Sequence, residues 1–162
     1  MSDYVLGCDN GLDGSFVLLH KSGEIHNWWV MPTYDKTSGR GISLGGLKEI
    51  RKSIPKPSLV SVVIERPTFS KSARAAMSMY ESFGTVLGFF AGAGFKVSSI
   101  TPMEWQKPIL SAKAGDTKPA ALRLAQELWP NETWLATKLS RKPHDGGVDG
   151  ALIAEYGRRN NL

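Results

Sequence analysis

Residues 59–65, Leu-Val-Ser-Val-Val-Ile-Glu, decide the fold of this chain, because an apolar β-branched run ends here on the carboxylate of Glu65. Pro57 stands before the run and Pro67 after it. A short continuous apolar run between turn-forming residues predicts a strand that is covered on both faces. We therefore expect this strand to lie inside a sheet that carries helices on either side.

The residues that precede this strand predict an antiparallel meander. Apolar runs separated by Gly-, Asp- and Ser-containing turns predict strands over residues 3–8, 15–20 and 25–31. Residues 31–46 are polar and basic and predict a loop. A short amphipathic helix is expected over Leu44–Ser53, ended by the prolines that follow it.

The residues that follow the strand alternate between helix and strand. Apolar residues at three- and four-residue spacing predict a long helix over 69–92. A strand over 95–100 and further helices from Thr101, from Asp116 or Thr117 to Trp129, and over 148–159 complete the chain. The expected architecture is α/β, a mixed five-stranded sheet of an antiparallel meander plus parallel strands, with helices on both faces.

Length and composition exclude several classes of protein. The 162 residues predict one compact domain over residues 1–162, and the 41% hydrophobic content is that of a globular chain. The single cysteine, Cys8, excludes an intrachain disulfide framework and favours a reducing, cytoplasmic location. No apolar run predicts a membrane span, and the N-terminus does not have the pattern of a signal peptide. Twenty Lys and Arg against fifteen Asp and Glu give a net charge of +5, which favours polyanionic partners only moderately.

Four acidic residues stand where α/β sheets build sites. Asp9 ends the first strand, Glu65 ends the apolar strand, and Asp145 and Asp149 open the last helix. A carboxylate at the end of a buried strand is costly unless it is compensated, and Mg²⁺ prefers such oxygen ligands. Four carboxylates are enough to hold two ions, one activating water and the other stabilising a leaving oxygen in phosphodiester cleavage.

Each of these residues also has a purely structural interpretation. Asp9 is a good turn former before Asn10-Gly11, and Glu65 could pair with Arg66. Asp145 and Asp149 could both cap the last helix. Cys8, next to Asp9, is expected on the opposite face of its strand as a buried small hydrophobe.

Three motifs resemble those of the RuvC-type Holliday junction resolvases. They are residues 7–14 (GCDNGLDG), residues 62–65 (VVIE) and residues 144–152 (HDGGVDGAL), and their order spans nearly the whole chain. The phage-encoded branch is the most similar, on the segments Met-Pro-Thr at 31–33, Thr-Pro-x-x-Trp at 101–105 and Ala-Glu-Tyr-Gly-Arg-Arg at 154–159.

The resemblance implies an RNase H-like fold, a homodimer and paired symmetric nicking of four-way DNA junctions. The larger side chains of the long helix, Met77, Tyr80, Phe83 and Leu87, are then expected in the core and in the dimer interface. It gives the metal-ligand and catalytic roles to Asp9, Glu65, Asp145 and Asp149, with two Mg²⁺ or Mn²⁺ ions and no small-molecule cofactor. Two departures from the family pattern are Asn10, where proline is commoner, and the four-residue spacing of Asp145 and Asp149. The fourth ligand is therefore open between Asp145 and His144, and Asp145 is favoured because hard cations prefer oxygen. His144 is otherwise an auxiliary proton carrier or a loop residue.

Contacts to DNA are expected from basic residues near the carboxylates, because phosphate supplies most of the affinity. The resemblance further implies that an aromatic residue near the start of the long helix stacks on bases of the opened junction; a packing role in a hydrophobic staple is the alternative. The expected DNA-binding residues are Phe69, Lys71, Arg74, Lys118, Lys138, Arg141, Lys142, Lys36 and Arg40.

Two alternatives stay open at this point. The same carboxylates would serve a related RNase H-like nuclease that cuts other branched DNA or RNA–DNA hybrids. A module that binds branched DNA without cutting belongs to a different class, and the presence of all four carboxylates argues against it. The Asp9-x-Gly11 turn also resembles a phosphate-binding motif of actin-like phosphotransferases, but 162 residues are too few for their two linked domains.

Overall fold

A computed structural model describes residues 2–37, 39–68, 70, 72–110 and 116–162. Its centre is a five-stranded sheet in the order β3-β2-β1-β6-β7. β1, β2 and β3 pair antiparallel, and β6 and β7 extend the sheet in parallel with β1. The strands are β1 (Tyr4–Asp9), β2 (Ser15–His20), β3 (Ile25–Val30), β6 (Val60–Glu65) and β7 (Lys96–Ile100). The predicted meander and mixed sheet are confirmed.

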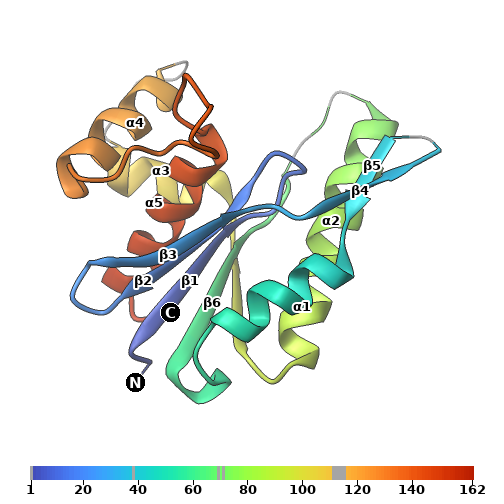
Figure 1. The fold of residues 1–162 in the computed structure, drawn as a ribbon, viewed down its shortest axis with the longest axis horizontal. Helices are drawn as coiled ribbons and strands as arrows, with labels where there is room; N and C mark the ends of the chain where they lie inside the picture. Colours follow the sequence, from blue (N-terminus) through green and yellow to red (C-terminus); the bar gives the residue numbers. More distant parts are fainter. Residues whose placement is uncertain (1, 38, 69, 71, 111–115) are drawn as a thin grey trace.

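Helices cover both faces of this sheet, as predicted (Figure 1). The strands alternate between the two cores, because successive side chains point to opposite faces. Val5 and Val63 belong to the core under α5, whereas Leu6 and Cys8 belong to the core under α1 and α2. One layer holds α3 (Pro102–Leu110), α4 (Thr117–Leu128) and α5 (Asp145–Arg159), and the other holds α1 (Leu44–Ser53) and α2 (Ala73–Gly92).

The prediction of a loop over residues 31–46 is wrong. The segment forms a separate β-hairpin of β4 (Thr33–Lys36) and β5 (Gly39–Ile42), with Asp35 opposite Arg40. The hairpin is anchored at its base, because Met31 and Ile42 are buried in the core under α1 and α2. Gly39 adopts a φ of +128°, which a residue with a side chain rarely adopts. A short 3₁₀ helix, η1 (Pro57–Leu59), leads into β6.

α5 lies unusually close to the sheet because its inner face is made of small residues. A Cβ atom added at Gly7 of β1 would stand 2.2 Å from the Gly150 carbonyl oxygen and 2.4 Å from the Ala154 nitrogen. The Ser15 hydroxyl of β2 donates to the Gly146 carbonyl oxygen at 2.6 Å, so β2 is also bonded to the helix. This close packing fixes the height of α5 above the ends of β1 and β2.

Two predicted details of the helices also need correction. α5 begins at Asp145 rather than Val148, because the His144 side chain caps the helix: its Nδ1 accepts from the Gly147 N–H at 2.9 Å. Asp145 and Asp149 therefore do not serve as its caps. On α2, the four residues expected in the core and the dimer interface divide: Phe83 and Leu87 pack against the core, whereas Met77 and Tyr80 are 74% and 52% exposed and do not.

Among the described residues, no helix is long and apolar enough to cross a membrane.

Candidate active site

The ends of two parallel strands bring two carboxylates side by side. β1 and β6 pair in parallel with Cys8 opposite Ile64, so Asp9 and Glu65 follow at the same edge of the sheet. α5 crosses above this edge and adds a third carboxylate, Asp149. The charges of Asp9 and Glu65 both raise the pKa of Asp149, which shows that the three groups lie within electrostatic reach of one another. The structure thus brings together residues from three distant segments of the chain.

Burial raises the pKa of all three carboxyl groups. Loss of water contact, followed by the charges of Asp9, Glu65 and Asp145, raises the pKa of Asp149 to about 7. Burial also raises the pKa of Glu65 to about 7, although a hydrogen bond from Trp105 opposes the shift. Buried like charges that raise each other's pKa are typical of sites that bind cations or transfer protons.

Trp105 is a site residue that the sequence did not reveal. Trp105 lies on α3; its indole Nε1 donates to Glu65 Oε2 at 2.6 Å, and its side chain is fully buried. Glu65 is thus engaged by Trp105 rather than by Arg66, the partner considered from the sequence. The helix that carries Trp105 begins with a capping box, in which Glu104 accepts from the Thr101 N–H at 2.6 Å.

Local hydrogen bonds shape the end of β1. Asp9 Oδ1 accepts from the Gly11 N–H at 3.0 Å, as expected of an aspartate that opens a turn. Burial raises the pKa of Asp9 and this backbone hydrogen bond opposes the shift. Asn10 is 5% exposed, and its side-chain amide lies between the Glu65 carbonyl oxygen and the Phe83 N–H. Both groups are hydrogen-bonded when the Asn10 amide nitrogen faces the Glu65 carbonyl oxygen. Asn10 therefore joins the ends of β1 and β6, a role that no local sequence pattern indicates.

The fourth carboxylate has a different environment. Asp145 is exposed and accepts from Lys118 Nζ at 2.6 Å, which links the first turn of α5 to that of α4. The Lys118 charge also lowers the pKa of Asp9 and of Asp149, although burial outweighs it in both. His144 uses Nδ1 as the helix cap, so Nε2 is the ring nitrogen left for other interactions.

Within the described part of the chain, no three His, Cys, Asp or Glu side chains are grouped so as to hold one metal ion. Nitrogen donors engage two of the four carboxylates, Glu65 through Trp105 and Asp145 through Lys118. The chemistry of the donor set nevertheless suits a hard divalent cation, because oxygen ligands are what Mg²⁺ prefers and burial still raises the pKa of Asp9, Glu65 and Asp149.

The residues expected to bind DNA lie in three regions around this edge. Lys118 contacts Asp145 directly, whereas Lys36 and Arg40 extend from the β4–β5 hairpin and pair with Glu81 and Asp13. Arg74 is on the first turn of α2 and lines a cavity of about 410 Å³ with Lys36 and Arg40. The exposed residues Lys138, Arg141 and Lys142 lie between α4 and α5. Phe69 and Lys71 fall outside the described residues.

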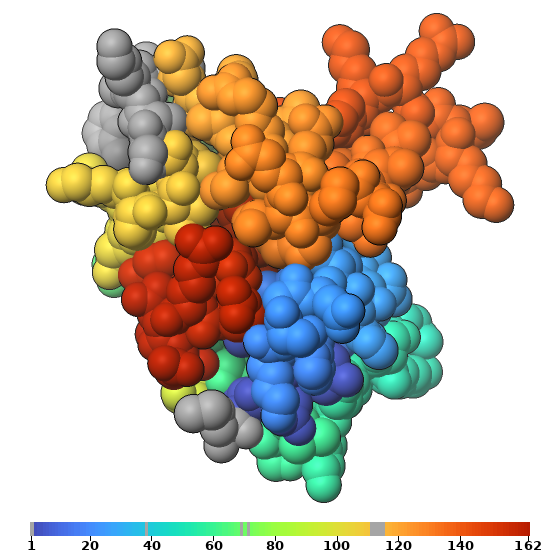
Figure 2. Space-filling model, turned by 90° about the vertical axis from the view of Figure 1, so that its left-hand side faces the viewer, coloured from blue at the N-terminus to red at the C-terminus, as the bar shows by residue number. Residues whose placement is uncertain are grey.

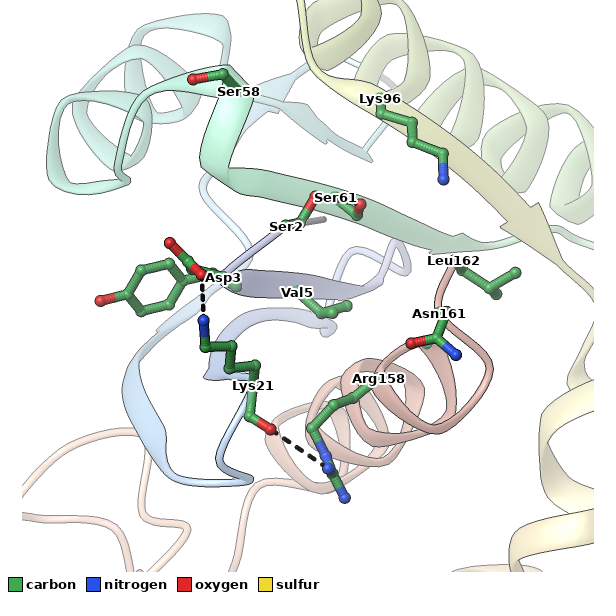
Figure 3. Close-up of a pocket in the computed structure, with 12 residues that line it drawn as sticks. Ser2, Asp3, Val5, Lys21, Ser58, Ser61, Lys96, Arg158, Asn161 and Leu162 are labelled. Atoms are coloured by element: carbon green, nitrogen blue, oxygen red, sulfur yellow. Dashed lines mark hydrogen bonds and ion pairs between the residues drawn. The ribbon is translucent and has the colours of Figure 1, made fainter.

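A cavity of about 730 Å³ lies at the other end of the strands (Figure 3). Asp3 and Val5 of the β1 end and Lys21, Lys96 and Arg158 help to line it. Two of its three cations are already neutralised, since Lys21 pairs with Asp3 at 2.6 Å and Arg158 pairs with the buried Glu155 at 2.6 Å. The cavity is therefore separate from the carboxylates and offers little free charge to an anion.

Comparison with known proteins supports the fold but finds no relative by sequence. No family model matches the chain, and no curated protein matches it. Two solved structures resemble it over nearly the full length of both chains. Thermus thermophilus RuvC in complex with a Holliday junction substrate has a TM-score of 0.60 at 16% identity, covering 97% of this chain and 95% of that one. Another Thermus thermophilus RuvC structure has a TM-score of 0.54 at 17% identity, covering 98% and 96%.

The sheet order, the helices on both faces and these structural matches define an α/β RNase H-like fold, as the sequence predicts. Among proteins of this fold, the chain is similar in structure to RuvC.

Proposed function

We propose that the protein is a metal-dependent endonuclease that resolves four-way DNA junctions by paired symmetric nicks. The observation that carries the proposal is the coupled carboxylate cluster of Asp9, Glu65 and Asp149 at one edge of an RNase H-like sheet. The matched RuvC structure that contains a Holliday junction substrate supports four-way junctions as the substrate. The resemblance of the sequence motifs supports the phage-like branch, and the single buried cysteine supports a cytoplasmic location.

In this proposal Asp9, Glu65, Asp149 and Asp145 hold two divalent cations, Mg²⁺ or Mn²⁺. When bound, such ions supply charge neutralisation and an activated water at phosphorus. The chain's own residues prepare the site. Trp105 directs Glu65, the turn at Gly11 directs Asp9, and close packing of α5 brings Asp149 over both. Lys118 lies beside Asp145 and contributes a positive charge near the scissile phosphate.

The single nuclease domain binds DNA through its basic rim. Lys118, Lys36, Arg40, Arg74 and the three cations between α4 and α5 surround the carboxylates and are proposed to contact phosphates, with Phe69 and Lys71 as further contacts. No small-molecule cofactor takes part.

A panel of labelled substrates tests this function. Purified protein with Mg²⁺ is incubated with four-way, three-way, duplex and RNA–DNA hybrid substrates. Paired symmetric nicks in the four-way junction alone are expected. Nicking of every branched form would assign a broader debranching activity instead, and cutting of the hybrid would assign an RNase H activity. Junction binding without cleavage in either Mg²⁺ or Mn²⁺ would make the protein a binding module.

The stability of the protein without metal should fall as the pH rises. The pKa values of Glu65 and Asp149 are about 7 in the folded protein, against ordinary values of 4.5 and 3.8 in the unfolded chain. As the pH rises, the unfolded chain therefore loses these protons first. The free energy of unfolding falls from about pH 4 upward as a result. The penalty is complete above pH 7 and is on the order of 3 to 4 kcal/mol for each of the two groups. Urea unfolding in EDTA at pH 5 and pH 8 measures it.

Divalent cations should reverse this trend, because they stabilise the ionised carboxylates. Mg²⁺ is expected to raise the free energy of unfolding more at pH 8 than at pH 5. The Asp149→Asn variant should show a smaller pH dependence and a smaller gain from Mg²⁺. Equal stability at both pH values, with no response to Mg²⁺, would contradict a coupled acidic metal site.

The proposed homodimer forms through the exposed face of α2. Gly84, Gly88 and Gly92 face open space, with no atom within 4 Å of a Cβ added to them, and the exposed side chains of Met77 and Tyr80 continue the same stripe. Such a stripe lets a second helix approach closely. Gly88→Arg should convert a dimer to a monomer in sedimentation equilibrium without loss of secondary structure. A wild-type chain that sediments as a monomer at micromolar concentration would refute the dimer.

A further inference from the structure

The segment between α4 and α5 places an apolar side chain in solvent. Leu139 is 91% exposed, the highest value among the large hydrophobic residues of the described chain. Lys138 precedes it, Arg141 and Lys142 follow closely, and all three are exposed. Among the described residues, none of the three forms an ion pair. Figure 2 shows this segment, in orange, projecting from the body of the molecule.

Hydrogen bonds give the projecting segment a defined shape. Its tip is a turn in which the Ser140 N–H donates to the Thr137 carbonyl oxygen at 3.0 Å, and the Leu139 N–H donates to Thr137 Oγ1 at 3.3 Å. Its base is closed by the His144 N–H, which donates to the Trp134 carbonyl oxygen at 2.7 Å. Trp134 is buried between the rings of Trp28 and Trp129. Leu139 therefore lies at the tip of a projecting segment whose shape is fixed by hydrogen bonds at its tip and its base.

The chemistry of the tip selects its partner. The centres of protein–protein interfaces are depleted in lysine, so an isolated leucine among three unpaired cations is a poor protein-docking surface. DNA suits both parts of the tip, because its phosphates take the cations and its base stack takes an apolar wedge. The segment also ends at His144 and Asp145, so it stands next to the carboxylates along the chain.

We propose that Leu139 is a wedge that inserts between base pairs at the branch point, while Lys138, Arg141 and Lys142 hold the flanking phosphates. The inference rests on the proposed function and adds to it the residue that opens the substrate. Leucine side chains inserted between base steps partly unstack them and kink the duplex. A branch point is the cheapest place for such insertion, because stacking there is already interrupted.

The test places 2-aminopurine, whose fluorescence rises on unstacking, at the branch point of a four-way junction. Binding is measured in EDTA, so that the junction stays intact. Wild-type protein should increase the fluorescence on binding. Leu139→Ala should bind with an affinity within about twofold of wild type, lose most of the increase, and cleave about tenfold more slowly in Mg²⁺. Leu139→Met should restore both signals. Leu44→Ala, which removes an equally large side chain that is 55% exposed on α1, is the matched control and should behave as wild type.

The proposed phosphate contacts of the three basic residues are tested separately, by the salt dependence of DNA binding. The combined change of Lys138, Arg141 and Lys142 to Ala should weaken binding and lower the slope of log affinity against log salt by about 2 to 3, since each lost phosphate contact removes about 0.9. An unchanged slope would overturn the phosphate contacts.

The outcomes separate the wedge from the proposed function. If wild type opens and cuts four-way junctions and Leu139→Ala does so equally well, the wedge is wrong and the function stands. If the wild-type protein does not act on four-way junctions, the same fluorescence comparison is made on the three-way or nicked substrate that it binds. A smaller increase with Leu139→Ala would support the wedge there, and an equal increase would refute it. A wild-type protein that binds none of these DNAs overturns both.

Discussion

Cleavage of a four-way junction should fall by about a thousandfold or more in the Asp149→Asn variant, while junction binding stays within a fewfold of wild type. The change keeps the shape of the side chain and removes one of the three coupled negative charges. Loss of a metal-holding oxygen charge costs several kcal/mol of transition-state stabilisation, and about 4 kcal/mol corresponds to a thousandfold. Binding should persist because the proposed phosphate contacts come from the basic residues around the carboxylates, which the variant keeps. Single-turnover cleavage and a gel-shift titration measure the two quantities.

Asp9→Asn should have the same effect, and β1 offers a matched control at its other end. Asp3→Asn makes the same chemical change just before the strand begins, where the carboxylate pairs with Lys21 on the surface. Such exposed pairs contribute about 0–1 kcal/mol, so cleavage should be unchanged. Full cleavage by Asp149→Asn or Asp9→Asn, or an equal loss in Asp3→Asn, would refute the carboxylate assignment.

The second large effect is structural, and it concerns Gly7. Gly7→Ala should lower the free energy of unfolding by about 3 kcal/mol or more, at the upper end of what overpacking costs. The new Cβ would stand 2.2 Å from the Gly150 carbonyl oxygen and 2.4 Å from the Ala154 nitrogen. Both are backbone atoms of α5 and cannot rotate away, so the whole helix must move from the sheet. Urea denaturation followed by circular dichroism measures the loss.

A glycine elsewhere in the chain provides the control for this change. Gly45 lies in the first turn of α1, where an added Cβ meets only Ser43 Oγ at 3.8 Å. Gly45→Ala should therefore be neutral or slightly stabilising, because alanine favours the helix. If Gly7→Ala is as stable as Gly45→Ala, β1 and α5 have room for a methyl group between them and the close contact is wrong.

Much of the fold could be predicted because its signals are local. The apolar run before Glu65 and the strand Ser15–His20 are evident from their composition, and the helix Leu44–Ser53 begins and ends as expected. The β4–β5 hairpin could not be predicted, because its short strands carry mostly polar residues and owe their stability to burial of Met31 and Ile42. The first turn of α5 was missed because its cap is a histidine, which is not among the preferred capping residues.

The candidate site likewise combines carboxylates whose positions the sequence predicts with contacts that it does not predict. Strand ends and helix starts indicated where Asp9, Glu65 and Asp149 would gather, since sheet topology alone brings such positions together. The partners of these carboxylates are tertiary contacts with no local signal. Nothing in the sequence around Trp105 pointed to Glu65, and the ion pair between Lys118 and Asp145 depends on how α4 and α5 meet.

The position of α5 has a consequence for the timing of activity during synthesis. Asp9 and Glu65 leave the ribosome before Asp149, because both precede it along the chain. Asp149 then reaches the other carboxylates only when α5 docks on Gly7 and Ser15. A nascent chain that has already paired β1 with β6 still lacks the third carboxylate of the proposed metal site. If the proposed nuclease function holds, this order keeps the chain inert toward nearby DNA until α5 has docked.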